Sequence, residues 1–171
     1  ESSAARGRLS GTRHPVVIAN AMEGEPASSK DAVLIAHSPH LVLDGISLAA
    51  RTVGATDAFI AVHRGSALVP VLDAALDERE AAGVDPLPIR LMTPPARYVS
   101  SEESALAHWV GEGIGVPVYP DRPFQRGAAG RPTLVQNAET LAHLALVARF
   151  GGEWFASVGA PSAPGTTLVS V

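Results

Sequence analysis

The sequence predicts an α/β fold in which helices cover a largely parallel sheet. One observation is that short apolar runs alternate with longer segments of helical periodicity. A second is that glycines stand where the helical segments should end, at Gly54, Gly83 and Gly151. A third is that a polar cluster directly follows the first apolar run, as it does where parallel strands end at a ligand site.

Apolar runs and capping residues give the order of the elements. Strands are expected over 15–19, 57–62 and 88–92. Helices are expected over 30–37, 39–52, 65–82, 102–110 and 137–150. The expected helix caps are Ser28, then Ser100 or Ser101, and finally Asn137. The segment over 111–131 is rich in glycine and proline and should be irregular, and 166–171 has the pattern of a further strand.

The composition excludes several classes of function. The net charge is -4 and no basic patch occurs, so nucleic acid is not an expected partner. No apolar run approaches the roughly 20 residues of a membrane span, so direct membrane insertion is not expected. Cysteine is absent, which excludes disulfides and an iron–sulfur cluster held by this chain's cysteines. His37 and His40 lack further ligands nearby, so no metal site is predicted. We expect a cytoplasmic location. If the chain is part of a larger complex at a membrane, it would lie at the periphery of that membrane.

Three polar clusters carry the candidate chemistry. The first follows the apolar run over 15–19, and the other two precede expected helices. Their residues are Asn20, Glu23 and Glu25, then Tyr98, Glu102 and Glu103, then Gln136, Asn137 and Thr140. Taken one at a time, each cluster has a structural explanation. Glutamates favour the first turn of a helix by about 0.3–1 kcal/mol, and asparagine is a common helix cap.

Together, the three clusters resemble the flavin-site blocks of the NADH-oxidising, FMN-carrying subunit of respiratory complex I. Related flavin subunits occur in NAD-linked hydrogenases and formate dehydrogenases. The order and approximate spacing of the blocks agree over 15–171. The matching blocks are Asn20-Ala21-Met22-Glu23-Gly24-Glu25-Pro26, the residues over 98–106, and Asn137-Ala138-Glu139-Thr140-Leu141.

The resemblance implies a Rossmann-like domain that holds FMN. In this family NADH stacks on the flavin and transfers a hydride to it, and electrons leave singly to an iron–sulfur cluster. The resemblance thus implies NADH as substrate, an electron-transfer partner subunit, and a cluster held outside this chain. It implies no catalytic side chain, because the flavin does the redox work. It places around the cofactor Asn20, Glu23, Glu25, Tyr98, Glu102, Glu103, Gln136, Asn137 and Thr140.

The resemblance also divides the chain. Residues 1–14 are expected to be a polar lead-in after the family's glycine-rich loop, 15–165 the FMN-binding domain, and 166–171 the start of a following domain. The chain departs from the family at three positions. The family has aspartate at Met22, glycine at Ser101 and asparagine at Gln136.

Two alternatives to an oxidoreductase stay open at this point. The departures favour a degenerate relative that keeps the fold as a docking or assembly module. A carboxylate-based hydrolase using Glu23 or Glu102 has little support, because no nucleophile, metal partner or Gly-x-Ser-x-Gly elbow is evident. The sequence also contains neither a GxGxxG motif nor a P-loop motif for binding phosphate.

Overall fold

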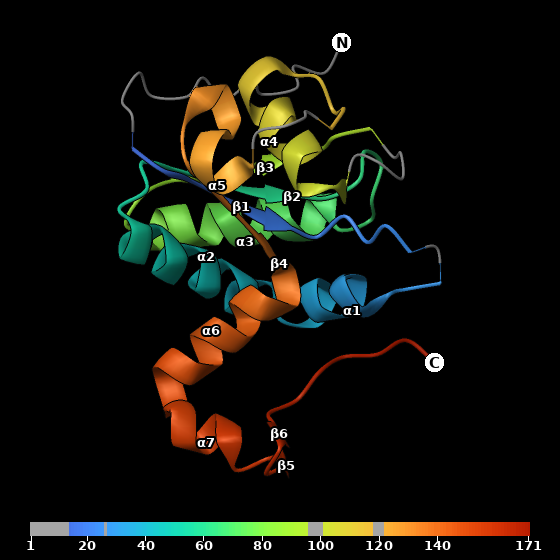
Figure 1. Cartoon of the computed structure of the whole chain (residues 1–171), viewed down its shortest axis with the longest axis vertical. Helices are drawn as coiled ribbons and strands as arrows, with labels where there is room; N and C mark the ends of the chain where they lie inside the picture. The colour runs from blue at the N-terminus through green and yellow to red at the C-terminus, as the bar shows by residue number, and fades with distance from the viewer. Residues whose placement is uncertain (1–13, 26, 96–100, 118–121) are drawn as a thin grey trace.

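A four-stranded parallel sheet forms the centre of the molecule (Figure 1). The computed structural model describes residues 14–25, 27–95, 101–117 and 122–171. Within them the strand order is β3-β2-β1-β4, and each neighbouring pair runs parallel. The strands are β1 (Val16–Asn20), β2 (Asp57–Ala61), β3 (Ile89–Met92) and β4 (Thr133–Asn137). The predicted α/β class is confirmed.

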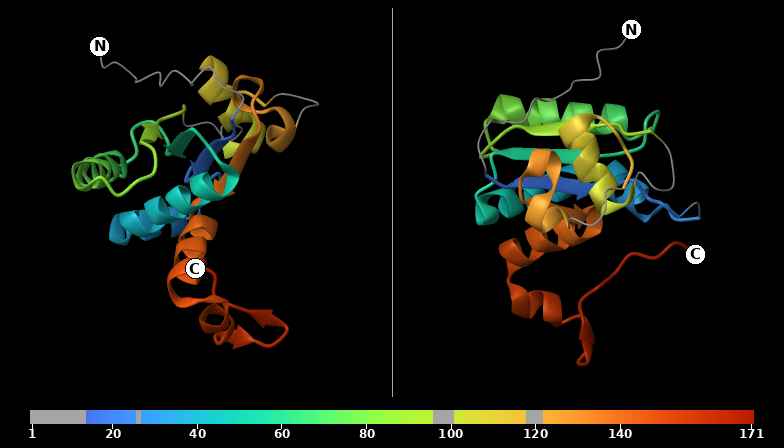
Figure 2. Two further views of the ribbon diagram at one scale, coloured as in Figure 1. Left: turned by 90° about the vertical axis from the view of Figure 1, so that its left-hand side faces the viewer. Right: turned by 45° about the horizontal axis from the view of Figure 1, so that its top comes forward.

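Helices cover both faces of this sheet (Figure 2). One face packs against α1 (Lys30–His37), α2 (Pro39–Val53), α3 (Val69–Ala82) and α6 (Ala138–Phe150). The other packs against α4 (Glu103–Glu112) and the short helix η2 (Ala128–Gly130), which follows α5 (Pro123–Arg126). No single helix in the described ranges is long and apolar enough to cross a bilayer, and α1 and α2 reach that length and composition only as a pair bent by 97°.

Alternation along β1 explains the two cores. Val17 and Ala19 join the larger apolar cluster with α1, α2, α3 and α6. Val16 and Ile18 join the smaller cluster with α4 and η2. Successive side chains of a strand point to opposite faces, so a continuous apolar run is what a strand covered on both sides requires.

Several elements differ from the sequence-based expectation. Strand β4 was not predicted, because it is only partly buried and ends in two amides that resemble the start of a helix. Helix α3 begins at Val69 rather than at residue 65, with Pro70 in its first turn, where proline fits. The segment over 166–171 forms no strand. The chain instead makes a small antiparallel pair just before it, β5 (Gly159–Ala160) and β6 (Ala163–Pro164), beyond α7 (Gly152–Ala156).

A close helix crossing depends on Gly45. A Cβ built on Gly45 in α2 would overlap the backbone carbonyl of Leu141 in α6. Replacing Gly45 by alanine is therefore expected to destabilise the protein by about 1–3 kcal/mol, the usual range for overpacking a core. Gly152→Ala is the matched control, since a Cβ there meets nothing within 4 Å. Denaturant unfolding compares the two variants, and equal stabilities would show that the helices do not meet as described.

A buried ion cluster joins three strands near their amino ends. The carboxylate of Asp57, fully buried in β2, accepts from Arg131 Nη1 at 2.8 Å and also pairs with Arg90 of β3. Arg131 lies just before β4 and donates to the backbone oxygens of His14 and Pro15, which lead into β1. Burial alone would raise the pKa of Asp57, but the hydrogen bonds and charges of the two arginines outweigh burial and lower this pKa.

The lowered carboxyl pKa values predict a loss of stability in acid. Burial would raise the pKa of Asp85, but the hydrogen bonds from Arg79 and Ser47 outweigh burial and lower this pKa. The pKa of Asp57 is lowered in the same way by its two arginines. These carboxylates stabilise the fold above their unfolded pKa, and their contribution is lost as the pH falls through the lower folded pKa. Asp31, whose pKa burial raises, acts in the opposite sense and offsets part of the change. Urea unfolding should show the free energy of unfolding falling below about pH 4. A stability that is constant or rises between pH 5 and 3 would contradict this account.

Candidate functional site

The carboxyl ends of β1 and β4 form a polar pocket. The parallel register pairs Asn20 with Asn137, so the last residues of two neighbouring strands stand side by side. Ligands of open α/β sheets bind at this edge. A pocket of about 270 Å³ lies there, and four of the predicted site residues line it: Asn20, Glu23, Glu25 and Asn137. Its other lining residues are Gly24, Ser28, Lys30, Asp31 and Ser101.

The two asparagines are held in defined orientations. Asn20 Oδ1 accepts from the Met22 backbone N–H at 3.2 Å, and its Nδ2 donates to the Ser101 backbone oxygen at 2.8 Å. Asn137 Oδ1 accepts from the Glu139 backbone N–H at 2.9 Å, which caps α6 as predicted. A carboxamide nitrogen carries two N–H donors. Among the described residues, each Nδ2 uses one donor, so each asparagine keeps one N–H for a ligand.

Glu23 caps helix α1 from a distance in the sequence. Its Oε1 accepts from the Asp31 backbone N–H at 3.0 Å, and its Oε2 accepts from the Ala32 backbone N–H at 3.2 Å. The prediction that Ser28 caps this helix is wrong, because Ser28 Oγ instead donates to Glu23 Oε1 at 2.7 Å. A carboxylate at a helix N-terminus is stabilised by the unpaired N–H groups and by the helix dipole. Glu23 therefore holds the turn after β1 against α1.

A charged cluster that the sequence-based site prediction omitted lies beside Asn137. The ammonium of Lys30 is 2.6 Å from Asp31 Oδ1, 3.1 Å from Asn137 Oδ1 and 3.4 Å from Glu139 Oε2. Burial opposes the charge on Lys30, but its hydrogen bonds and its two acidic neighbours outweigh burial and raise its pKa. Burial raises the pKa of Asp31, an effect larger than the lowering caused by Lys30. The sequence offered one signal for this cluster, since Lys30 is the only lysine in the chain.

Four other predicted site residues, Glu102, Glu103, Gln136 and Thr140, do not line this pocket. Glu102 caps α4 by accepting from the backbone N–H groups of Ser104 and Ala105, so the expected cap by Ser101 is wrong. Glu103 and Thr140 are exposed in the first turns of α4 and α6, and Gln136 pairs in register with Ala19. Tyr98 and Ser100 lie outside the described residues.

Two of the departures from the family pattern have clear positions. Met22 is fully buried and packs in the smaller core with residues such as Leu106 of α4. Ser101 lines the pocket beside Gly24, and a Cβ on Gly24 would lie 2.7 Å from Ser101 Oγ. The side chain of Ser101 therefore takes up space at the edge of the pocket, whereas the side chain of Met22 belongs to the core.

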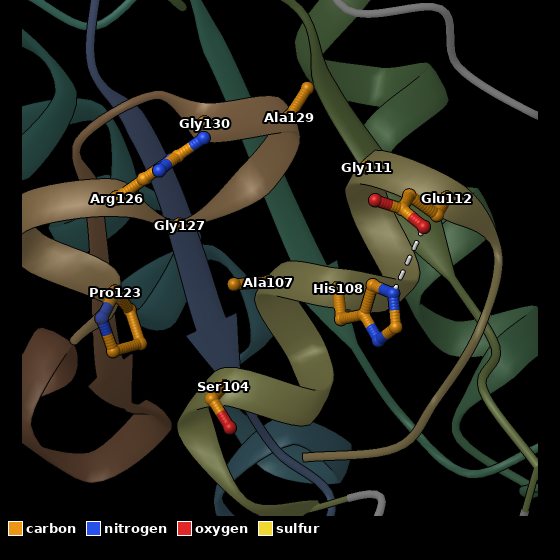
Figure 3. Close-up of a pocket in the computed structure, with 10 residues that line it drawn as sticks. All are labelled: Ser104, Ala107, His108, Gly111, Glu112, Pro123, Arg126, Gly127, Ala129 and Gly130. Carbon is orange, nitrogen blue, oxygen red and sulfur yellow. Dashed lines mark hydrogen bonds and ion pairs between the residues drawn. The ribbon is translucent and has the colours of Figure 1, made fainter. Parts of the chain in front are cut away.

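A second, larger pocket lies between α4 and the α5–η2 segment (Figure 3). It measures about 560 Å³, and none of the predicted site residues that the structure describes line it. Its ionisable side chains are Arg126, His108 and Glu112, and the last two lie 3.1 Å apart between Nε2 and Oε2. We take the smaller pocket as the candidate site, because it lies at the strand ends and two of its amides offer unused N–H donors.

The chemistry of the smaller pocket favours a neutral ligand group. Three carboxylates, those of Glu23, Glu25 and Asp31, face one ammonium, that of Lys30. This excess of negative charge disfavours a phosphate. The amide N–H groups and the oxygen acceptors suit the ring edge and hydroxyl groups of a flavin. The donor set therefore fits the uncharged part of FMN, and the phosphate needs donors elsewhere.

The chain is similar in sequence to a known domain family and to several named proteins. The model of the Nuo51 FMN-binding domain family matches residues 4–146. The alpha subunit of the NAD-reducing hydrogenase HoxS of Cupriavidus necator is 36% identical over 91% of this chain and 28% of its own length. The mitochondrial NADH dehydrogenase (ubiquinone) flavoprotein 1 of Dictyostelium discoideum is 33% identical over 93% of this chain and 36% of its own length.

One solved structure is similar to this chain in both fold and sequence. A chain of an NAD⁺-reducing NiFe hydrogenase in the H₂-reduced state superposes with a TM-score of 0.82 at 34% identity, over 91% of this chain and 28% of that chain. This chain thus spans between 28% and 36% of the length of these relatives.

Proposed function

Because this chain belongs to the Nuo51 FMN-binding domain family, we propose that the pocket between β1 and β4 holds the ring edge and ribityl chain of FMN. One observation carries the proposal. The register of the two strands places Asn20 and Asn137 side by side, both side chains line the pocket, and among the described residues each Nδ2 uses only one of its two N–H donors. Two such donors match the acceptor atoms along the edge of an isoalloxazine ring.

In the proposed oxidoreductase the protein orients the cofactor and tunes its surroundings. Bound FMN supplies hydride acceptance from NADH and onward electron transfer. Asn20 and Asn137 donate hydrogen bonds to the ring edge, and Glu23 keeps the turn after β1 in place by capping α1. The carboxylates of Glu23, Glu25 and Asp31 disfavour additional negative charge near the ring. Tyr98, Glu102, Glu103, Gln136 and Thr140 stay predictions that ligand-bound data would decide.

Two of the relatives carry the names of NAD-linked redox enzymes. One is named as the alpha subunit of an NAD-reducing hydrogenase, and another as a flavoprotein of NADH dehydrogenase. Following the resemblance, we assign the electron acceptor to an iron–sulfur centre outside this chain, and we expect a partner subunit in electron transfer. The chain itself contains no cysteine that could hold such a centre.

Flavin titration of the protein encoded by the full-length gene tests the proposal. FMN fluorescence should be quenched on binding, with one FMN per chain and a dissociation constant of about 1 μM or less. Riboflavin, which lacks the phosphate, should compete, since the described pocket fits the ring and ribityl groups. Adding NADH without oxygen should then bleach the flavin absorbance. No binding at micromolar FMN would remove the enzymatic function and favour the docking or assembly module.

A further inference from the structure

We propose that Lys30 is a positioning residue that fixes the orientation of the Asn137 amide, so that its N–H faces the flavin pocket. The inference rests on the proposed function and names a part of that site to which no role has been assigned. It concerns a side chain that acts through its neighbour, because Lys30 itself is occupied by protein groups.

The ammonium of Lys30 has no donor to spare. A lysine carries three N–H donors. Among the described residues, they face three acceptors, Asp31 Oδ1, Asn137 Oδ1 and Glu139 Oε2, at 2.6, 3.1 and 3.4 Å. Glu139 is in turn held by the backbone N–H of Leu168 at 2.6 Å and by the hydroxyl of Thr167 at 3.1 Å. Lys30 is therefore held in place by these three acceptors, and it can affect a ligand by positioning one of them.

The contacts of Asn137 allow only one orientation of its amide. Its Oδ1 accepts from Lys30 Nζ and from the Glu139 backbone N–H, and its Nδ2 donates to Asp31 Oδ2 at 3.3 Å. Rotating the amide by half a turn would set N–H donors against the ammonium and the backbone N–H. It would also set the amide oxygen against a buried carboxylate. Leaving buried polar groups without partners is costly, so the observed orientation is fixed.

The consequence is a donor, rather than an acceptor, aimed at the cofactor. With Oδ1 occupied by Lys30, the second N–H of Asn137 is the group left for a ligand. Without Lys30, Oδ1 of Asn137 loses one of its two donors, and the orientation of the amide is less firmly fixed. We therefore expect the Lys30→Met variant to bind FMN more weakly, although the three donors of Lys30 face protein groups.

A double-mutant cycle on FMN affinity, in the full-length protein, tests this coupling. Lys30→Met and Asn137→Ser should each raise the dissociation constant of FMN about fivefold, the cost of one hydrogen bond of about 1 kcal/mol. Serine keeps an oxygen for capping α6. The double variant should also be about fivefold weaker, whereas independent effects would multiply to about 25-fold. Arg51→Met removes an exposed cation from α2 and is the matched control, with unchanged affinity expected.

Two further measurements separate positioning from simple support of the fold. The midpoint potential of bound FMN should become more negative by the same amount in Lys30→Met and Asn137→Ser, because a donor at the ring edge favours the reduced flavin. Lys30→Arg keeps N–H donors and should restore most of the affinity. In the Lys30→Met protein the buried carboxylate of Asp31 loses its cation. If that variant does not fold, the Lys30→Met/Asp31→Asn variant, which removes both charges, replaces it in the cycle.

The outcomes distinguish this inference from the proposed function. Wild-type affinity in Lys30→Met, or a 25-fold loss in the double variant, would overturn the positioning role while FMN binding stands. A failure of the unsubstituted protein to bind FMN would remove both.

Discussion

Replacing Arg131 by methionine is expected to lower the free energy of unfolding by about 3–5 kcal/mol, the cost of removing one partner from a buried ion pair. Arg131 and Asp57 are both buried, and without Arg131 the carboxylate of Asp57 would keep its ion pair with Arg90, whose side chain is 33% exposed. The variant would also lose the hydrogen bonds from Arg131 to His14, Pro15 and Thr56. Urea unfolding at pH 7 measures the effect.

Two companion variants identify the cause. Arg131→Met/Asp57→Asn removes the stranded buried charge and should recover part of the lost stability. Arg51→Met, on the exposed end of α2, should change the unfolding free energy by less than about 0.5 kcal/mol. An Arg131→Met protein as stable as the Arg51→Met control would contradict the buried cluster as described.

The largest functional effect is expected from removing both pocket amides together. The Asn20→Ser/Asn137→Ser variant should bind FMN about 30-fold more weakly, which corresponds to roughly 2 kcal/mol for two lost hydrogen bonds. Serine retains an oxygen for the backbone N–H groups of Met22 and Glu139 but loses the hydrogen bond that each Nδ2 donates, so a modest loss of stability is expected beside the loss of affinity. Titration of the variant with FMN, alongside its thermal unfolding, gives both quantities.

Gln125→Ser is the matched control for this pair. Gln125 is an exposed amide in α5 that lines neither pocket. Its loss should leave FMN affinity within about twofold of the wild type. If the double asparagine variant bound FMN as tightly as this control, the flavin would not contact the ends of β1 and β4.

The sequence predicted the helices and strands that are marked by residues within them or directly beside them. Helix α1 has the predicted bounds, and α2, β1, β2 and β3 differ by a residue at one or both ends, because apolar runs, prolines and closing glycines mark them. Strand β4 lacked such a signal. Only two of its five side chains are buried, and Gln136 and Asn137 read as the approach to a helix. Its place beside β1 depends on pairing across more than 100 residues, which no local pattern reveals.

In the candidate site, too, the sequence identified individual residues but not the contacts between them. Asn20 and Asn137 were predicted as separate polar clusters, and the parallel register of two strands brings them together. The capping of α1 by Glu23 instead of Ser28 depends on how the turn after β1 folds back. The contacts of Lys30 with Asn137 and Glu139 also require α1 to lie beside the start of α6. Composition marked Lys30 as unusual, but only the three-dimensional packing gives it a partner.

A structure of the full-length protein with FMN bound tests the central claim most directly. The account predicts ring-edge acceptors of the flavin at hydrogen-bonding distance, about 3 Å, from Nδ2 of both Asn20 and Asn137. A flavin seated instead between α4 and η2, in the larger cavity beside His108 and Arg126, would contradict it.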